Sequence, residues 1–205
     1  MNIIEIDKDK IKKAGEILAI AFKEDPIFKY IFQSPEKYDQ CAAWLFSTWV
    51  RWAVMFGKAW ITDDESAVII MRSIGKSDMS LWSMIRAGML PVPFKLGFGA
   101  FNRFYFEIVS MLDREHAKVM GKTPHWYGWM VGVKPEHKRV GWKLINHCIE
   151  IADCAQLPLF LETSTSRNVS LYNHKDFEVK HEKFIEEGNF TLYFMVRQPK
   201  SNVYI

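Results

Sequence analysis

The chain has 205 residues, of which 49% are hydrophobic and 25% charged, and its formal net charge is +3 at pH 7. These fractions are close to the globular average and exclude an intrinsically disordered chain. The length favours one domain, residues 1–205, that buries a full hydrophobic core. A charge this small gives no argument for nucleic-acid binding.

The cysteines and the apolar stretches indicate the compartment. Cys41, Cys148 and Cys154 are too few for a disulfide framework, and all three fall in stretches with helical periodicity. We therefore expect buried thiols in a reducing compartment. Residues 1–13 lack the apolar run of a signal peptide, and charged residues, prolines and glycines interrupt the apolar stretch 81–101. The sequence predicts a cytoplasmic protein.

The first predicted element is a short strand at Ile3–Ile6. Apolar residues at helical spacing follow over Ile11–Ala21, and Asp25-Pro26 ends that helix or begins a turn. Ser34 and Pro35 have the N-cap and first-turn signature of a helix that runs to Phe56, where Gly57 terminates it.

The middle of the chain begins with two strands and continues with helices. Ala59–Thr62 and Ala67–Met71 flank a polar turn and predict a hairpin. Residues 79–119 have helical patterns in two or three pieces, with a break near Gly88–Pro93, and are rich in Met and Phe. This helical insert either faces the core or covers a cleft, or else it forms an apolar pocket wall for a substrate.

The C-terminal half alternates strands and helices. Apolar runs and turn residues predict strands at His125–Val133, Pro158–Glu162, Phe177–His181 and Phe190–Val196, and helices at Val140–Ala155 and Asn168–Lys175. This order indicates an α/β or α+β fold with a partly parallel centre.

A basic turn joins the first of these strands to the first of these helices. Residues 134–143 contain Lys134, Lys138, Arg139 and Lys143 against the one acid Glu136, an excess equal to that of the whole chain. Free N–H groups and the dipole at a helix start suit an anionic phosphate. The alternative is a solvated basic turn without a ligand.

A second segment places polar side chains at a strand end. The strand at 158–162 ends in the carboxylate of Glu162, and a polar turn then enters a short helix. Asn168 and Tyr172 are four residues apart, so they share one face of that helix.

Together these two segments resemble the GNAT acyltransferase superfamily. The family pattern is a strand ending in V-x-P, a Q/R-x-x-G-x-G/A loop that enters a helix, and a downstream N…Y…GF segment. The stretches HWY…VGVKPEH and LPLFLETSTSRNVSLYNHKDFEV, with FKEDPIF near the N-terminus, look closer to the branch that contains puromycin N-acetyltransferase. The resemblance covers roughly residues 124–197 and implies a mixed, twisted central sheet flanked by helices.

The resemblance also implies acetyl-coenzyme A as co-substrate, with no metal. Its contacts would come from Val131, Gly132, Val133, Lys138, Arg139, Val140, Gly141, Trp142, Lys143 and Asn168. Lys138 takes the Q/R place and Gly141 the central glycine. Arg139 and Lys143 depart from the pattern, because many members have small residues there, and Asp176 replaces the glycine of the GF pair.

The implied reaction is direct attack of a primary amine of a small molecule on the thioester in a ternary complex. Tyr172 matches the family's general acid, which protonates the leaving thiolate. Glu162 is the first candidate base, although a strand-end carboxylate can also simply cap a turn. His125 is a second candidate, but His125 and His116 are more simply interpreted as structural hydrogen-bonding groups.

A second hypothesis is a GNAT-fold protein that has lost catalysis and binds coenzyme A or another ligand as a regulator. The departures at Arg139 and Lys143 motivate it. The aromatic and basic residues would also suit a protein of membrane surfaces or nucleic acid, but their spacing fits core packing better. We therefore expect no nucleic acid and no membrane as partner, and a monomer or homodimer.

Overall fold

The strands of the chain form the frame on which the site is built. A computed structural model describes residues 1–74 and 79–200, except for the side chains of Ile74, Lys138 and Arg139. The described residues form a seven-stranded sheet in the order β1–β2–β3–β4–β5–β7–β6. The strands are β1 (Ile3–Glu5), β2 (Lys58–Thr62), β3 (Ala67–Ile74), β4 (His125–Val133), β5 (Leu159–Thr163), β6 (Glu178–Ile185) and β7 (Phe190–Arg197).

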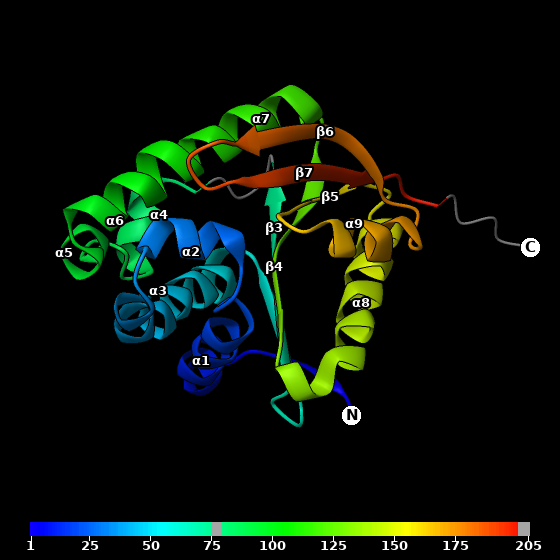
Figure 1. Cartoon of the computed structure of the whole chain (residues 1–205). Coiled ribbons are helices and arrows are strands. Elements are labelled where there is room, and N and C mark those ends of the chain that lie inside the picture. The colour runs from blue at the N-terminus through cyan, green and yellow to red at the C-terminus, as the bar shows by residue number, and fades with distance from the viewer. Residues whose placement is uncertain (75–78, 201–205) are drawn as a thin grey trace, which may run out of the picture.

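Only the central pair of the sheet, β4 and β5, is parallel, and every other neighbouring pair is antiparallel. Figure 1 shows β5, β7 and β6 running across the direction of β3 and β4. The mixed α/β fold with a partly parallel centre is therefore confirmed.

Helices cover both faces of this sheet. One face carries α1 (Ile11–Ala21), which follows a short 3-10 turn (Lys8–Lys10), then α2 (Pro26–Phe32), α3 (Pro35–Phe56) and α7 (Ser110–Met120). The other face carries α8 (Gly141–Cys154) and α9 (Ser166–Asn173). The core accordingly divides into two apolar clusters, one on each face of the sheet.

Helix starts follow local capping chemistry. The Ser34 hydroxyl accepts a hydrogen bond from the Lys37 amide at 3.2 Å, with Pro35 in the first turn, as the sequence predicts. Asp25 has the same role for α2, because its carboxylate accepts from the Ile27 amide at 2.9 Å. Asp25-Pro26 therefore begins a helix, where the sequence indicated only a stop or a turn.

The predicted helical insert is confirmed, in more pieces than expected. It comprises α4 (Leu81–Arg86), α5 (Val92–Leu96), α6 (Phe98–Asn102) and a π-helical stretch, η2 (Arg103–Val109), that continues into α7. α5 packs against α3, and α7 packs against β6 and β7. Of the three thiols expected to be buried, Cys41 and Cys148 are buried, but Cys154 is exposed at the end of α8, so that prediction was wrong.

Candidate active site

An opening between β4 and β5 is the central feature of the candidate site. The two strands pair only at Trp126 with Leu159 and at Tyr127 with Phe160, and the Trp126 amide donates to the Pro158 carbonyl at 2.9 Å. Directly afterwards the pairing of β4 with β3 shifts register at Ile70/Met71, which is the mark of a β-bulge. The facing edges of β4 and β5 beyond this point can therefore hydrogen-bond an extended ligand.

The direction of the β4 amides decides which residues face this opening. The Lys134 amide donates to the Ser66 carbonyl of the β3 side at 2.9 Å, and Gly132 pairs with Val68. Main-chain groups alternate between the two edges of a strand. Val131 and Val133 therefore present theirs to the opening, whereas Gly132 faces β3.

The glycine at position 132 is explained by packing. A Cβ there would lie 2.7 Å from Leu18 Cδ2 and 3.1 Å from Ala21 Cβ. Only a glycine lets α1 approach β4 this closely. The sequence leads us to expect a contact of Gly132 with a cofactor. Its main chain, however, pairs with β3, and the packing of α1 explains why the residue is a glycine, so neither feature supports that contact.

The basic turn lies at the end of β4, as predicted. Pro135–Val140 forms a 3-10 helix, η3, that leads directly into α8 at Gly141. Gly141 is buried against Val133, since a Cβ there would lie 3.1 Å from Val133 Cγ2. Val140 is half-buried, Lys143 is exposed, and Lys175 Nζ lies 5.5 Å from the ring centroid of Trp142. The side chains of Lys138 and Arg139 lie outside the described residues.

Helix α9 places Asn168 and Tyr172 beside the end of β5. Asn168 Nδ2 donates to Thr163 Oγ1 at 3.1 Å and so ties α9 to the strand end. The Tyr172 ring packs 5.5 Å from that of Phe177, on the α8 face of the sheet. Burial, with a smaller contribution from Cys148, raises the pKa of Tyr172 to about 12. The phenol therefore keeps its proton at neutral pH.

Glu162 lies on the other face of the sheet. The Tyr127 hydroxyl donates a short hydrogen bond to Glu162 Oε1, whereas Oε2 is buried without a hydrogen-bond partner in the part of the chain that the structure describes. Burial raises the pKa of Glu162 to about 7, against the lowering effects of Tyr127 and Arg72. The carboxylate can thus accept and release a proton near neutral pH.

Aromatic rings and a second acid surround this carboxylate. The Arg72 guanidinium lies 5.3 Å from the Trp129 ring centroid and 5.6 Å from that of Tyr127, within cation–π range. Asp113 of α7 raises the pKa of Glu162 further, and burial raises its own pKa. Negative charge and aromatic faces therefore meet on this side of the opening.

The two histidines form a structural pair, as the simpler interpretation predicted. His125 Nδ1 lies 2.6 Å from the Thr123 carbonyl, which can only accept, so Nδ1 carries the proton. His125 Nε2 then accepts from His116 Nε2 at 2.7 Å. The His116 ring stacks 4.2 Å from that of Phe160. Burial lowers the pKa of both imidazoles, and both rings pack against Phe160 in the core.

A carboxylate that sequence reasoning did not assign also reaches the site. Ser164 Oγ, at the end of β5, donates to Asp25 Oδ2 at 2.8 Å, and burial raises the pKa of Asp25. The bond joins the turn between α1 and α2 to the strand end. The partners are 139 positions apart in the sequence, which explains why no local pattern shows the bond.

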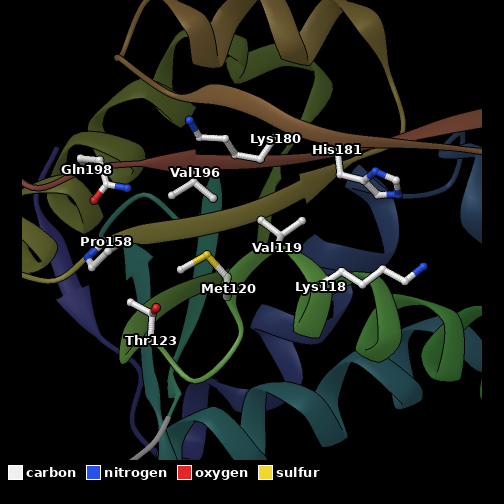
Figure 2. Close-up of a pocket in the computed structure, with 9 residues that line it drawn as sticks. All are labelled: Lys118, Val119, Met120, Thr123, Pro158, Lys180, His181, Val196 and Gln198. Carbon is white, nitrogen blue, oxygen red and sulfur yellow. The ribbon is translucent and has the colours of Figure 1, made fainter.

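A hollow in the surface of the described residues lies away from the opening between β4 and β5. Figure 2 shows a cavity of about 390 Å³, lined by Lys118, Val119, Met120, Thr123, Pro158, Lys180, His181, Val196 and Gln198. It lies where β5 begins, before the strands separate. Lys118 Nζ donates to Glu115, Lys180 pairs with Glu178, and His181 Nε2 lies 3.1 Å from Glu115 Oε2. None of the predicted site residues lines it. This cavity is therefore separate from the candidate site at the opening.

Comparison with known proteins shows that the chain is similar to acetyltransferases. No profile of a known protein family matches the chain. An uncharacterized N-acetyltransferase of Schizosaccharomyces pombe is 24% identical over 204 residues, which cover 96% of this chain and 83% of the relative.

Solved structures share the fold at lower identity. The structure of histone acetyltransferase HPA2 and related acetyltransferase from Corynebacterium glutamicum has a TM-score of 0.67 and 18% identity, covering 98% of each chain. Arylalkylamine N-acetyltransferase 2 of Aedes aegypti has a TM-score of 0.67 and 13% identity, covering 97% of this chain and 99% of its own.

Proposed function

The chain has the fold of the GNAT superfamily, and on that premise we propose that it is an N-acetyltransferase. It would transfer an acetyl group from acetyl-coenzyme A to a primary amine of a small molecule by direct attack in a ternary complex. The observation that carries this proposal is the opening after Tyr127 and Phe160, with Tyr172 on one face of the sheet and Glu162 on the other. We assign the activity to one domain, residues 1–205, with the cytoplasm as the expected compartment.

The opening supplies the groups that an acyl-coenzyme A needs. The main-chain edge of Val131 and Val133 suits the amides of an extended arm, and the start of α8 at Val140, Gly141 and Trp142 suits a phosphate. Lys138, Arg139 and Lys143 would add positive charge at the same end. The role of Asn168 would be to hold α9 against β5. Acetyl-coenzyme A would bring an acyl group activated as a thioester.

Tyr172 and Glu162 divide the proton transfers. A phenol with a pKa of about 12 is protonated at neutral pH, so Tyr172 can supply the proton that a leaving thiolate takes up. A carboxyl with a pKa of about 7 is about half ionised at that pH, so Glu162 can take a proton from the substrate ammonium and leave the neutral amine that attacks the thioester carbonyl. The hydrogen bond from Tyr127 leaves Oε2 as the acceptor atom.

The surroundings of Glu162 favour a cationic amine with an apolar body. Asp113 and Glu162 would attract the ammonium group against the repulsion of Arg72, whose guanidinium lies 5.3 Å from the centroid of the Trp129 ring. The Trp129 ring lies 5.8 Å from that of Trp49, which stacks on Phe104 of η2 at 5.7 Å. The helical insert thus reaches this aromatic cluster. The sequence resembles the puromycin N-acetyltransferase branch, and such an acceptor is consistent with that resemblance. Membership of this branch stays a prediction.

The test separates donor binding from catalysis. Acetyl-coenzyme A at millimolar concentration should raise the Tm of the chain, because a ligand that binds the folded state stabilises it. A panel of aromatic and aliphatic primary amines should then release coenzyme A, and mass spectrometry should identify the acetylated product. Tyr172→Phe should lower turnover about 10²-fold or more with the thermal shift unchanged, whereas the exposed control Tyr105→Phe should leave both unchanged.

Each failure has a distinct meaning. Without any thermal shift, the proposed donor is wrong. A shift without acetylation of any amine would favour the second hypothesis, a coenzyme A-binding regulator. Equal turnover of Tyr172→Phe and wild type at neutral and alkaline pH would exclude Tyr172 as the acid.

A further inference from the structure

An apolar surface lies on the helical insert, outside the proposed reaction site. Its side chains, which we call the insert patch, are Leu81, Trp82, Leu90, Phe94, Phe98 and Phe106, and their exposed fractions run from 60% to 88%. Single exposed apolar residues are ordinary, but a cluster of this size on a soluble domain marks an interaction surface. Packing among residues 1–74 and 79–200 leaves the insert patch uncovered.

The insert patch is presented by a fixed scaffold. Val92, Leu96 and Ala100 of α5 and α6 are buried, and Cys41 Sγ of α3 donates to the Lys95 carbonyl at 3.3 Å. With these residues turned inward, the most exposed pair, Phe94 and Phe98 at 88% each, points outward. Figure 1 shows α5 and α6 at one extremity of the molecule, away from the sheet. The part of the insert patch on α5 and α6 therefore lies at a protruding tip of the molecule.

The charge around the tip indicates the occupant. Residues 79–107 contain Arg86, Lys95 and Arg103 against one acid, Glu107, whose carboxylate accepts hydrogen bonds from Tyr30 and Asn102. Arg86 and Lys95 lie along rings of α3, at 5.6 Å from the Phe56 centroid and 5.9 Å from that of Trp44. A second copy on a two-fold axis would bring like charges together, whereas an anionic surface complements them.

We propose that the insert patch docks on an anionic lipid membrane. Exposed Leu, Trp and Phe side chains with neighbouring Lys and Arg are the composition of segments that lie in the headgroup region of a bilayer. Such docking requires no spanning segment, and no helix of residues 1–74 and 79–200 is long and apolar enough to cross a membrane. The proposal departs from the expectation, drawn from sequence alone, that no membrane is a partner.

Vesicle flotation of the full chain tests this proposal independently of any acetyltransferase activity. Wild type should float with phosphatidylcholine vesicles that contain phosphatidylserine, and less with phosphatidylcholine alone or at high salt. The double variant Phe94→Ser/Phe98→Ser should lose about tenfold or more in affinity. Both side chains are exposed, so its Tm should stay unchanged, and Phe184→Ser on β6 is the matched exposed control.

Several outcomes would overturn the proposal. They are absence of flotation with either vesicle, equal flotation of the double variant, and equal loss in Phe184→Ser. A concentration-dependent dimer in light scattering that the double variant abolishes would also overturn it, because the occupant would then be a second copy. Flotation that Phe94→Ser/Phe98→Ser removes and Phe184→Ser retains supports it.

Discussion

The ionisation of Glu162 gives the sharpest test of the site, through the variant Glu162→Gln. The substitution keeps an oxygen that can accept the Tyr127 hydrogen bond and removes the buried negative charge. In wild type, burial raises the pKa of this group from 4.5 to about 7. The folded state therefore holds its proton more tightly than the unfolded chain.

The sign and the size of the effect follow from linkage. Between pH 4.5 and about 7 the unfolded chain loses the proton first, so the contribution of Glu162 to the stability of wild type falls as pH rises through this window. Above it the charged carboxylate costs about 3 kcal/mol as an upper limit. Glu162→Gln escapes this cost, so its stability relative to wild type should rise with pH. At about 3 °C per kcal/mol the gain in Tm is at most roughly 9 °C.

Thermal unfolding at pH 5 and pH 8.5 measures this difference directly. Glu162→Gln should gain Tm relative to wild type at the higher pH, and the exposed control Glu182→Gln should show no such change. The same variant should lose acetyl transfer to any acceptor found. If the difference in Tm from wild type is the same at both values of pH, Glu162 does not carry a buried, raised pKa and the assignment of the base fails.

Three further predictions concern stability. Gly132→Ala brings a Cβ within 2.7 Å of Leu18 Cδ2 and should lower the free energy of urea unfolding by about 1–3 kcal/mol; unchanged stability would refute the close approach of α1. Asp176 has a φ of 63°. Asp176→Val should therefore lower the free energy of unfolding by about 1–2 kcal/mol, while Asp176→Gly should change it by no more than about 0.5 kcal/mol. Equal effects of the two variants in urea titration would argue against a left-handed backbone. Burial next to His125 lowers the pKa of His116 from 6.5 to about 4, so the contribution of His116 to stability should be lost as pH falls through this range. His116→Gln should reduce that loss by up to about 3 kcal/mol, and a parallel fall in both proteins would exclude His116 as its source.

Much of the candidate site could be predicted because its signals are local. The strand from His125 to Val133, the basic turn and the following helix are contiguous, so periodicity and Pro135 were enough to place them. At Asp176 the backbone geometry adds a physical reason to the sequence pattern. It stands where the family has glycine, and its positive φ shows why that position favours a glycine.

Other features depend on contacts between distant residues or on exposure. Asp25 caps α2 and bonds Ser164, but its sequence context, Asp25-Pro26, indicates a stop as readily as a start. The resemblance implies a cofactor contact at Gly132, whereas the close approach of α1 to this glycine is visible only in the packed structure. Phe94 resembles a core residue by type, and only the packed structure shows that it is exposed.

Hydrogen exchange of individual β4 amides, followed by NMR with and without acetyl-coenzyme A, tests the central claim most directly. Val131 and Val133 face the opening, so their amides should gain protection when acetyl-coenzyme A binds. The Gly132 amide pairs with β3 in both states and should change little. If saturating acetyl-coenzyme A leaves the amide exchange of Val131 and Val133 unchanged, or slows that of the residues lining the cavity of Figure 2 instead, the opening between β4 and β5 is not the donor site.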